Sequence, residues 1–260
     1  MATRTNSAVM RIEMAPPPAA WDKLKPKTLV ERVIEALMAG AAQGLILSGD
    51  RLIETEIAQN LGVSRVPVRE ALRVLESQGV VVNEPYRGIR LMSVTAERID
   101  NIIEVRLSLE TAAAASAIRQ RRNGADDGGA MDRLIGEMER RADAHDLYGF
   151  ATADTKFHRV MCGLAGNPVL MSLWDMLARQ MTIIFGLAAL GKPVRQIIEE
   201  HRTLLAIFRS GDIGATARAI EDHISVQTHA VDFDAIIARR RAEVGGAQAG
   251  CAPVSGSVLT

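Results

Sequence analysis

The sequence predicts a mainly α-helical protein in which three helices and a β-hairpin are followed by an all-α antiparallel bundle of about six helices. Two observations favour this fold class. Aromatic residues make up 3% of the 260 residues while Ala, Leu, Ile and Met are abundant, a composition that favours helices over sheets. Apolar residues also recur at helical spacing along most of the chain, with one interruption by two short β-rich runs between residues 80 and 92.

Composition also limits the classes of function. The formal net charge is zero, so any affinity for nucleic acid must come from a local patch of charge. Cys162 and Cys251 are too few and too isolated for a disulfide framework or a cysteine-rich zinc site, which fits a reducing cytoplasm. The longest apolar run, residues 181–191, is too short to span a bilayer, and the N-terminus shows no secretory signal. We therefore expect a cytoplasmic protein without a membrane partner.

Composition divides the chain into four segments. Residues 1–24 include the run APPPAA and are expected to form a flexible arm. Residues 245–260 are small, polar and unpatterned, and are expected to be disordered. Between these segments, residues 25–93 and residues 95–241 are the two predicted domains.

The first predicted domain contains three helices and a hairpin. LVERVIEALMAGAAQG is an amphipathic helix that Gly44 ends, and ETEIAQNLG is a short helix that Gly62 stops. Ser64 is a natural N-cap for a third helix, which tolerates Pro67 in its first turn and ends near Gly79. VVVN and GIRLM then flank the turn EPYR as a β-hairpin. This order of elements is that of a winged helix-turn-helix.

The second predicted domain contains no convincing strand. Helix starts and stops follow caps such as Thr95 and breaks such as GNP, GKP and SGD. Because the connecting loops are short, neighbouring helices are expected to run antiparallel. The predicted helices span about 95–122, 130–145, 149–164, 168–190, 193–209 and 213–241.

The start of the third helix is the predicted surface for contact with DNA. In a helix-turn-helix the second helix enters the major groove, and its N-terminal residues reach base edges or phosphates. Here these residues are Ser64, Arg65, Val66, Val68 and Arg69. Arginine suits both tasks because its planar fork pairs bidentately with guanine and with phosphate. The alternative is an ordinary solvated helix face.

Local charge pairing distinguishes three evenly spaced arginines on this helix. Arg73 has Glu70 and Glu76 at neighbouring helical positions, so its charge is largely balanced within the helix. Arg65 and Arg69 have no acidic residue at those offsets, and they lie near a helix start, where positive charge is unfavourable. We therefore expect Arg65 and Arg69 to meet an external anion, which DNA supplies.

The run GDRLIETEIAQNLGVSRVPVREALRVLESQGVV resembles the DNA-binding domain of the GntR superfamily. The resemblance covers the whole first domain and rests on a long motif. It implies that Thr55 and Gly88 contact DNA, although Thr55 could instead cap the second helix and Gly88 could simply serve the hairpin turn. The DNA contacts implied by the resemblance are Thr55, Ser64, Arg65, Arg69 and, on the wing, Arg87 and Gly88.

Three histidines and a carboxylate lie on inward-facing positions of the second domain. Asp154 and His158 are four residues apart on one helix face, and His201 and His223 lie on the apolar faces of two other predicted helices. A single histidine on such a face is most often a hydrogen-bonded core residue. Three of them with an aspartate instead indicate a nitrogen-rich site suited to Zn, Ni or Mn.

The same segments resemble the FCD domain, the helical ligand-binding domain of the FadR subfamily of GntR regulators. DTKFH, EEH and DHI match the family pattern, and the resemblance covers most of residues 95–235. It implies that Asp154, His158, His201 and His223 are the ligands of a divalent metal ion.

Arg106 is predicted to point partly into the bundle, because it shares a helix face with Ile99, Ile102 and Ile103. A buried arginine needs an anion. One candidate is Glu110, four residues later; the other is a bound carboxylate, with equal weight. EVRLSLE resembles an FCD segment whose arginine often faces the effector, which implies an organic acid that bridges Arg106 and the metal.

Together these features predict an effector-responsive transcription regulator, a repressor and not an enzyme, in which a metal ion and a small organic acid control operator binding. A helix-turn-helix commonly binds palindromic double-stranded DNA as a two-fold dimer, so we expect a homodimer. The alanine-rich run ETAAAASAIR packs either within the bundle or at the dimer contact. One alternative is a metal-dependent enzyme fused to a DNA-binding module, but Glu200 is too poorly oriented to be a clear general base. The other alternative is a regulator whose metal is purely structural.

Overall fold

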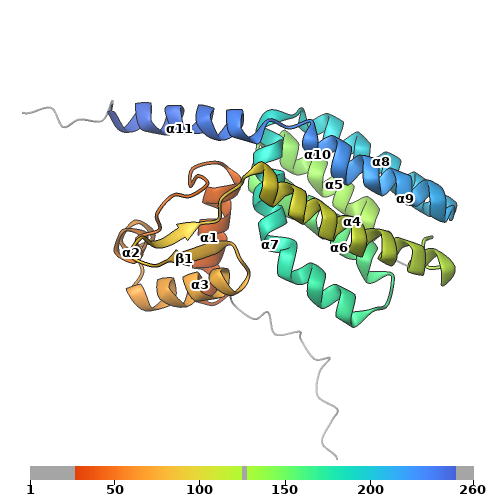
Figure 1. Cartoon of the computed structure of the whole chain (residues 1–260), viewed down its shortest axis with the longest axis horizontal. Coiled ribbons are helices and arrows are strands. Elements are labelled where there is room, and N and C mark those ends of the chain that lie inside the picture. Colours follow the sequence, from red (N-terminus) through yellow and green to blue (C-terminus); the bar gives the residue numbers. More distant parts are fainter. Residues whose placement is uncertain (1–26, 125–127, 250–260) are drawn as a thin grey trace, which may run out of the picture.

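The computed structural model describes residues 27–124 and 128–249, which form two domains side by side (Figure 1). The smaller N-terminal domain is a winged helix-turn-helix, and the larger domain is helical. This arrangement confirms the predicted fold class. The predicted flexible arm, residues 1–24, and residues 250–260 of the predicted tail lie outside the described residues.

Capping residues set the helix boundaries of the N-terminal domain. Thr28 and Glu31 form a capping box: the Thr28 hydroxyl accepts from the Glu31 N–H at 3.1 Å, and the Glu31 carboxylate accepts from the Thr28 N–H at 2.7 Å. Gly62 ends the second helix in the left-handed conformation, with φ +64°. The elements are α1 (Leu29–Ala42), α2 (Glu54–Leu61), α3 (Arg65–Ser77), β1 (Val81–Glu84) and β2 (Gly88–Leu91).

The two strands form the wing. They pair antiparallel, with Val81 opposite Leu91 and Glu84 opposite Gly88. Val81 and Leu91 are buried against the domain core, whereas Tyr86 in the turn is fully exposed. The wing is therefore anchored at one end and presents its turn to solvent.

The C-terminal domain is an antiparallel helical bundle whose core contains Phe150, Phe157, Trp174 and Phe208. Asp146, Asn167 and Asp212 cap three of its helices through their side chains. Its first six helices are α4 (Ala96–Arg119), α5 (Ala130–Asp143), α6 (Leu147–Gly163), α7 (Pro168–Gly191), α8 (Val194–Ser210) and α9 (Ile213–Glu221).

The prediction of one final helix over residues 213–241 is wrong. After α9 the chain forms a π-helical turn, η2 (Asp222–Val226), then α10 (Gln227–His229), and it breaks before α11 (Phe233–Ala249). The wider π turn keeps Ile224 buried while it directs His223 toward the bundle, and such turns often occur at functional sites. The predicted disordered tail from residue 245 is also partly wrong, because α11 continues to Ala249.

Helix α7 is long and apolar enough to cross a membrane, judged by length and composition alone. Half of its most apolar window is buried inside the protein, and Trp174 and Ile183 on this helix are fully buried. The core helix of a soluble protein has the same properties, so this feature is weak evidence for a membrane span.

The two domains contact each other at the end of α3. The Arg98 guanidinium donates to the backbone oxygen of Gly79 and to the Gln180 side-chain oxygen, both at 2.9 Å. The Gln180 amide donates to the backbone oxygen of Gln78 at 2.8 Å, and Arg179 donates to the Gln78 side chain. Helix α7 therefore touches the C-terminal end of the helix that begins at Arg65.

Helices α1 and α7 approach so closely at Gly186 that an added Cβ would lie 2.5 Å from the Ala42 carbonyl oxygen. Because backbone must move, Gly186→Ala is expected to destabilise the protein by about 1–3 kcal/mol. The control is Gly163→Ala, where the nearest atom to an added Cβ is the Met171 sulfur at 4.0 Å. Thermal unfolding should show a lower Tm for Gly186→Ala alone; equal Tm values would contradict the close approach.

Candidate DNA-reading surface and metal centre

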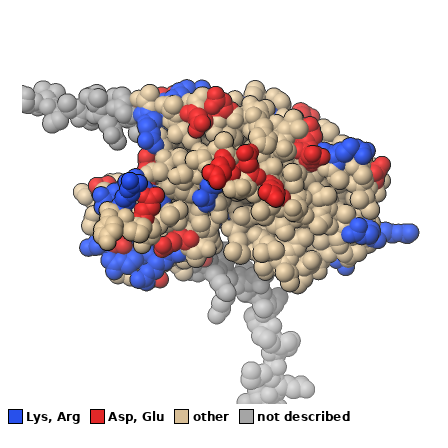
Figure 2. Space-filling view, viewed as in Figure 1, with Lys and Arg blue, Asp and Glu red and all other residues tan. Residues whose placement is uncertain are grey.

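The start of α3 presents four of the five predicted DNA contacts at the surface; the prediction for Val68 is wrong, because its side chain is completely buried in the domain core. Ser64 is the N-cap residue, as predicted, but its hydroxyl makes no capping hydrogen bond. Val66 is 68% exposed, and the side chains of Arg65 and Arg69 are 58% and 48% exposed. Figure 2 shows Lys and Arg side chains gathered over the part of the N-terminal domain where α2 and α3 lie. These side chains are thus free to reach a DNA groove.

The prediction that Arg65 and Arg69 have no acidic partner is wrong. Glu54, at the start of α2, accepts from Arg65 Nη2 at 3.2 Å and from Arg69 Nε and Nη2 at 3.2 and 3.1 Å. These hydrogen bonds, chiefly the one from Arg69, lower the pKa of Glu54. A comparison of positions within α3 could not find the contact of these two arginines with Glu54, because Glu54 lies on α2. The Arg73–Glu70 pair is confirmed, at 3.2 Å.

The other predicted contacts lie on α2 and on the wing. Thr55 is exposed in the first turn of α2; the N-cap is Ile53, so the alternative of a capping role for Thr55 is wrong. Arg87 has a 75% exposed side chain 3.8 Å from Glu84. Gly88 has φ +79°, a conformation that favours glycine, so its role in the hairpin turn is supported independently of DNA.

Glu54→Gln is expected to raise the affinity for non-operator DNA, because Arg65 and Arg69 lose the carboxylate that partly neutralises them. It should also lower the preference for operator by about tenfold, because the same carboxylate holds the two guanidinium groups in position. Glu56→Gln is the control, since it removes the same charge from an exposed position of α2. Fluorescence anisotropy with an operator selected from random DNA, and with scrambled DNA, measures both affinities. Identical behaviour of the two variants would show that Glu54 contributes charge alone.

The second predicted site brings its residues together in the bundle interior. Asp154 and His158 come from α6, His201 comes from α8 and His223 comes from the π-helical turn η2. The Nε2 atoms of His158 and His223 are 3.1 Å apart. Asp154 Oδ1 lies 3.3 Å from His201 Nε2 and 3.6 Å from His158 Nε2. One ring nitrogen from each histidine lies within 4.8 Å of the others.

The separations of 3.1 and 3.3 Å fit a shared metal ion, and the third, 3.6 Å, is slightly longer. Two ligands about 2.1 Å from one ion, at octahedral or tetrahedral angles, lie about 3.0–3.4 Å apart. Asp154 Oδ1 and His201 Nε2 are buried and make no hydrogen bond within the described residues, which is costly unless another group satisfies them. The donor set therefore fits a divalent cation.

Hydrogen bonds through the Nδ1 atoms of two histidines direct their Nε2 atoms into the cluster. His201 Nδ1–H donates to the Ile197 carbonyl oxygen at 2.8 Å. His158 Nδ1–H donates to Glu110 Oε2, also at 2.8 Å. With the proton fixed on Nδ1, each Nε2 has a lone pair directed into the cluster. Metal-binding histidines are commonly oriented in this way.

Glu110 links His158 to Arg106, a connection that the sequence analysis missed. Its other oxygen accepts from Arg106 Nε at 2.8 Å, and both side chains are almost completely buried. Burial opposes the ionised form, but the charge of Arg106 and the hydrogen bonds from His158 and Arg106 outweigh it and hold the pKa of Glu110 at about 2. The two alternatives for Arg106 are therefore compatible: Glu110 binds Nε, while the buried Nη2 has no protein partner in the described part of the chain.

The histidines differ in their tendency to carry charge. Burial, reinforced by nearby positive groups, places the pKa of His223 well below its ordinary value, and burial likewise lowers the pKa of His158. For His201 burial acts in the same direction, but the Asp154 carboxylate outweighs it and raises the pKa. Neutral imidazole is the form that binds metal, so His158 and His223 are already in that form at neutral pH.

The cluster opens onto a small cavity, the inner cavity, of about 50 Å³. Arg106, Asp154, His201 and His223 line it, together with Phe185 on α7. The Phe185 ring centroid is 5.0 Å from the Arg106 guanidinium carbon. The free Nη2 of Arg106 and the metal-binding cluster therefore border the same space.

Comparison with known proteins places the chain in a family. The model described as bacterial regulatory proteins, gntR family, matches residues 29–91, and the FCD domain model matches residues 101–226. An HTH-type transcriptional regulator from the TAR-I ttuE-ttuC' intergenic region of Agrobacterium vitis is 30% identical over 159 residues, covering 57% of this chain and 87% of that protein. The chain belongs to the GntR family of bacterial regulatory proteins.

Two further proteins resemble this GntR-family regulator along most of its length. The probable D-xylose utilization operon transcriptional repressor of Paenarthrobacter nicotinovorans is 28% identical over 207 residues, covering 80% of this chain and 90% of that protein. The structure of E. coli McbR/YncC has a TM-score of 0.61 at 21% identity, covers 86% of this chain and 100% of that chain, and shows the shared fold.

Family membership makes the protein a DNA-operator-binding transcription regulator with a C-terminal FCD effector-binding domain. The matched families and relatives are regulators, which disfavours the enzyme alternative. Glu200, the carboxylate considered as a base, is held in an ion pair with Lys192 at 2.6 Å.

Proposed function

We propose that this GntR-family regulator is a cytoplasmic, homodimeric repressor that leaves its palindromic operator when the FCD domain binds a small organic acid at a metal ion. The observation that carries this proposal is the convergence of unsatisfied buried groups on the inner cavity: Asp154 Oδ1, His201 Nε2 and Arg106 Nη2. Repression is supported by the printed descriptions of two relatives, the D-xylose utilization and the Bacillus subtilis gluconate operon repressors.

Asp154, His158, His201 and His223 would hold the metal, which is Zn, Ni or Mn in this proposal. When bound, the ion supplies a Lewis-acid anchor for an oxygen atom of the acid, because four protein ligands leave up to two octahedral positions. Arg106 Nη2 donates a charge-assisted hydrogen bond to the carboxylate of the acid. Glu110 positions Arg106, and the surrounding apolar side chains exclude water.

Helix α7 supplies a physical link from this cavity to the DNA-reading head. Its Phe185 packs on Arg106, and five residues earlier Gln180 is hydrogen-bonded to Arg98 and to the end of α3. A ligand that binds better when α7 is displaced would therefore also change the placement of α3. Regulation requires that the ligand bind with different affinity to the two positions of α7.

The dimer of this proposal does not use the centre of the alanine-rich run. Ala113, Ala114 and Ala117 are completely buried within the described chain, where α4 packs against α9. The run therefore packs within the bundle, one of the two alternatives that the sequence left open.

Elemental analysis of the purified protein is expected to find about one divalent metal ion per chain, because one cluster of His, Cys, Asp or Glu in the described part of the chain has a suitable geometry. Treatment with a chelator should remove the ion, and addition of Zn, Ni or Mn should restore it. The control is His229→Ala, since His229 lies on the surface 2.8 Å from Asp100. Wild-type protein that neither contains nor takes up metal would contradict the proposed site.

A further inference from the structure

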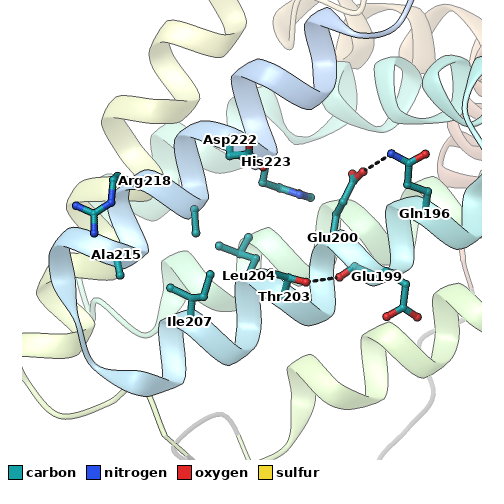
Figure 3. A pocket seen from close by; sticks show the side chains of 11 residues that line it. Gln196, Glu199, Glu200, Thr203, Leu204, Ile207, Ala215, Arg218, Asp222 and His223 are labelled. Carbon is teal, nitrogen blue, oxygen red and sulfur yellow. Dashed lines mark hydrogen bonds between the residues drawn. The ribbon is translucent and has the colours of Figure 1, made fainter.

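A groove on the surface lies next to the inner cavity. It has a volume of about 630 Å³, runs between α8 and α9, and is lined by Thr203, Leu204 and Arg218 among others (Figure 3). We call it the outer groove. Glu200 and His223 line both the outer groove and the inner cavity. The Glu200 side chain therefore stands at the boundary between the two spaces.

Glu200 is paired with a second cation of the inner cavity. Lys192, the residue after α7, places its Nζ 2.6 Å from Glu200 Oε1 and 2.7 Å from Gln227 Oε1. The Lys192 and Glu200 side chains are only 11% and 16% exposed. Glu200 also accepts from Gln196 at 3.1 Å on the groove side (Figure 3). Lys192 and Arg106 thus both line the inner cavity, and a protein carboxylate already binds Lys192.

We propose that the effector is a dicarboxylate, whose first carboxylate binds Arg106 and whose second binds Lys192 in place of Glu200. This inference rests on the proposed function and names the chemical class of its ligand. Gln227 donates to the second carboxylate through its amide group after the side chain reorients. The displaced Glu200 carboxylate turns into the outer groove.

The size of the inner cavity requires such a displacement. Its volume of about 50 Å³ is far below the roughly 300–1,000 Å³ of common ligand pockets. Glu200 and His223 are the two wall residues that also line the 630 Å³ outer groove, and of these Glu200 is not a proposed metal ligand and can turn into that space. Turning outward returns its carboxylate to water, while Lys192 exchanges one carboxylate for another. The exchange therefore opens the cavity without leaving a buried charge unpaired.

The exchange also reaches the DNA-reading head. Lys192 follows the last residue of α7, and Gln180, on the same helix, contacts Gln78 and Arg98 at the domain boundary. Gln227, the other partner of Lys192, begins α10 directly after the π turn that carries His223. A second carboxylate at Lys192 therefore acts on both the metal-binding turn and the helix that meets α3.

Isothermal titration of full-length, metal-loaded protein with matched acids tests the proposal. Malate and 2-hydroxybutyrate form one pair, and glucarate and gluconate form another; within each pair the main difference is the second carboxylate. At least one diacid is expected to bind about tenfold more tightly than its monoacid partner, the value of one additional charge-assisted hydrogen bond. In Lys192→Met this preference should nearly disappear, while monoacid affinity is retained, which also shows that the variant is folded.

Two further variants complete the experiment. Arg195→Met is the matched control, because Arg195 is an exposed cation of α8 paired with Asp143 on the surface, and it should keep the preference. Glu200→Gln removes the competing carboxylate and should tighten diacid binding several-fold without tightening monoacid binding. Equal affinity for diacids and monoacids in the wild type, or an unchanged preference in Lys192→Met, would overturn the dicarboxylate proposal alone. If no acid of either kind bound, the proposed function would fail and this inference with it.

Discussion

Arg65→Ala and Arg69→Ala are each expected to lower operator affinity by about tenfold to a hundredfold, the cost of one lost bidentate contact with a base. Both side chains are about half exposed at the start of α3, where a recognition helix meets base edges. Glu54 occupies Arg69 Nε and Nη2, so Nη1 and the outer edge of the fork stay available to DNA. Anisotropy titration of the selected operator measures the loss.

Arg73→Ala is the matched control for these two substitutions. It removes the same charge from the same helix, but Arg73 pairs with Glu70 and lies two turns beyond Arg65. Its operator affinity should stay within about threefold of the wild type, since exposed pairs of this kind contribute little. Thermal unfolding should be unchanged in all three variants. Full operator affinity in the Arg65→Ala and Arg69→Ala variants would refute the reading-head assignment.

His201→Ala is expected to abolish stoichiometric metal binding and the stabilisation that metal gives. In the wild type, free metal at about a hundredfold above its Kd should add about 3 kcal/mol to the free energy of unfolding. The variant loses the Nε2 ligand that His201 directs at Asp154, so its Tm should not respond to metal. Differential scanning calorimetry with and without added metal gives both values.

The same variant separates sensing from a purely structural role of the metal. His229→Ala should retain the full response to metal, because His229 is an exposed residue that pairs with Asp100 and is not one of the proposed metal ligands. If His201→Ala stays folded by circular dichroism but fails to bind acids, the metal serves the effector. Global unfolding of His201→Ala, together with unfolding of the chelated wild type, would favour the structural alternative.

Features set by local sequence could be predicted. The helix start at Thr95, the stop at Gly62 and the hairpin follow from capping and turn chemistry that involves only neighbouring residues. The helix start at Ser64 could also be predicted, although its hydroxyl makes no capping hydrogen bond. The inward direction of His158 and His201 follows from helical periodicity, and both side chains are completely buried. Their convergence on one point required the family resemblance as well.

Features that depend on contacts between elements could not be predicted in this way. Glu54 lies eleven residues before Arg65 and on another helix, and Glu110 reaches His158 from a position 48 residues away. No Gly or Pro marks the π turn at His223 in the sequence, and Ile220 and Ile224, which are completely buried, continue the apolar spacing of an ordinary helix. In the sequence, Lys192 is recognisable only as part of the helix break GKP. Its position in the wall of the inner cavity depends on how the helices pack.

Release of labelled operator by organic acids tests the central claim most directly. Metal-loaded wild-type protein bound to operator should release the DNA when an effective mono- or dicarboxylic acid is titrated, as followed by anisotropy. Chelated wild type and His201→Ala should still bind the operator but should not respond to that acid. Release at the same acid concentration with the metal removed would contradict the account, because the metal and Arg106 would then not form the sensing site.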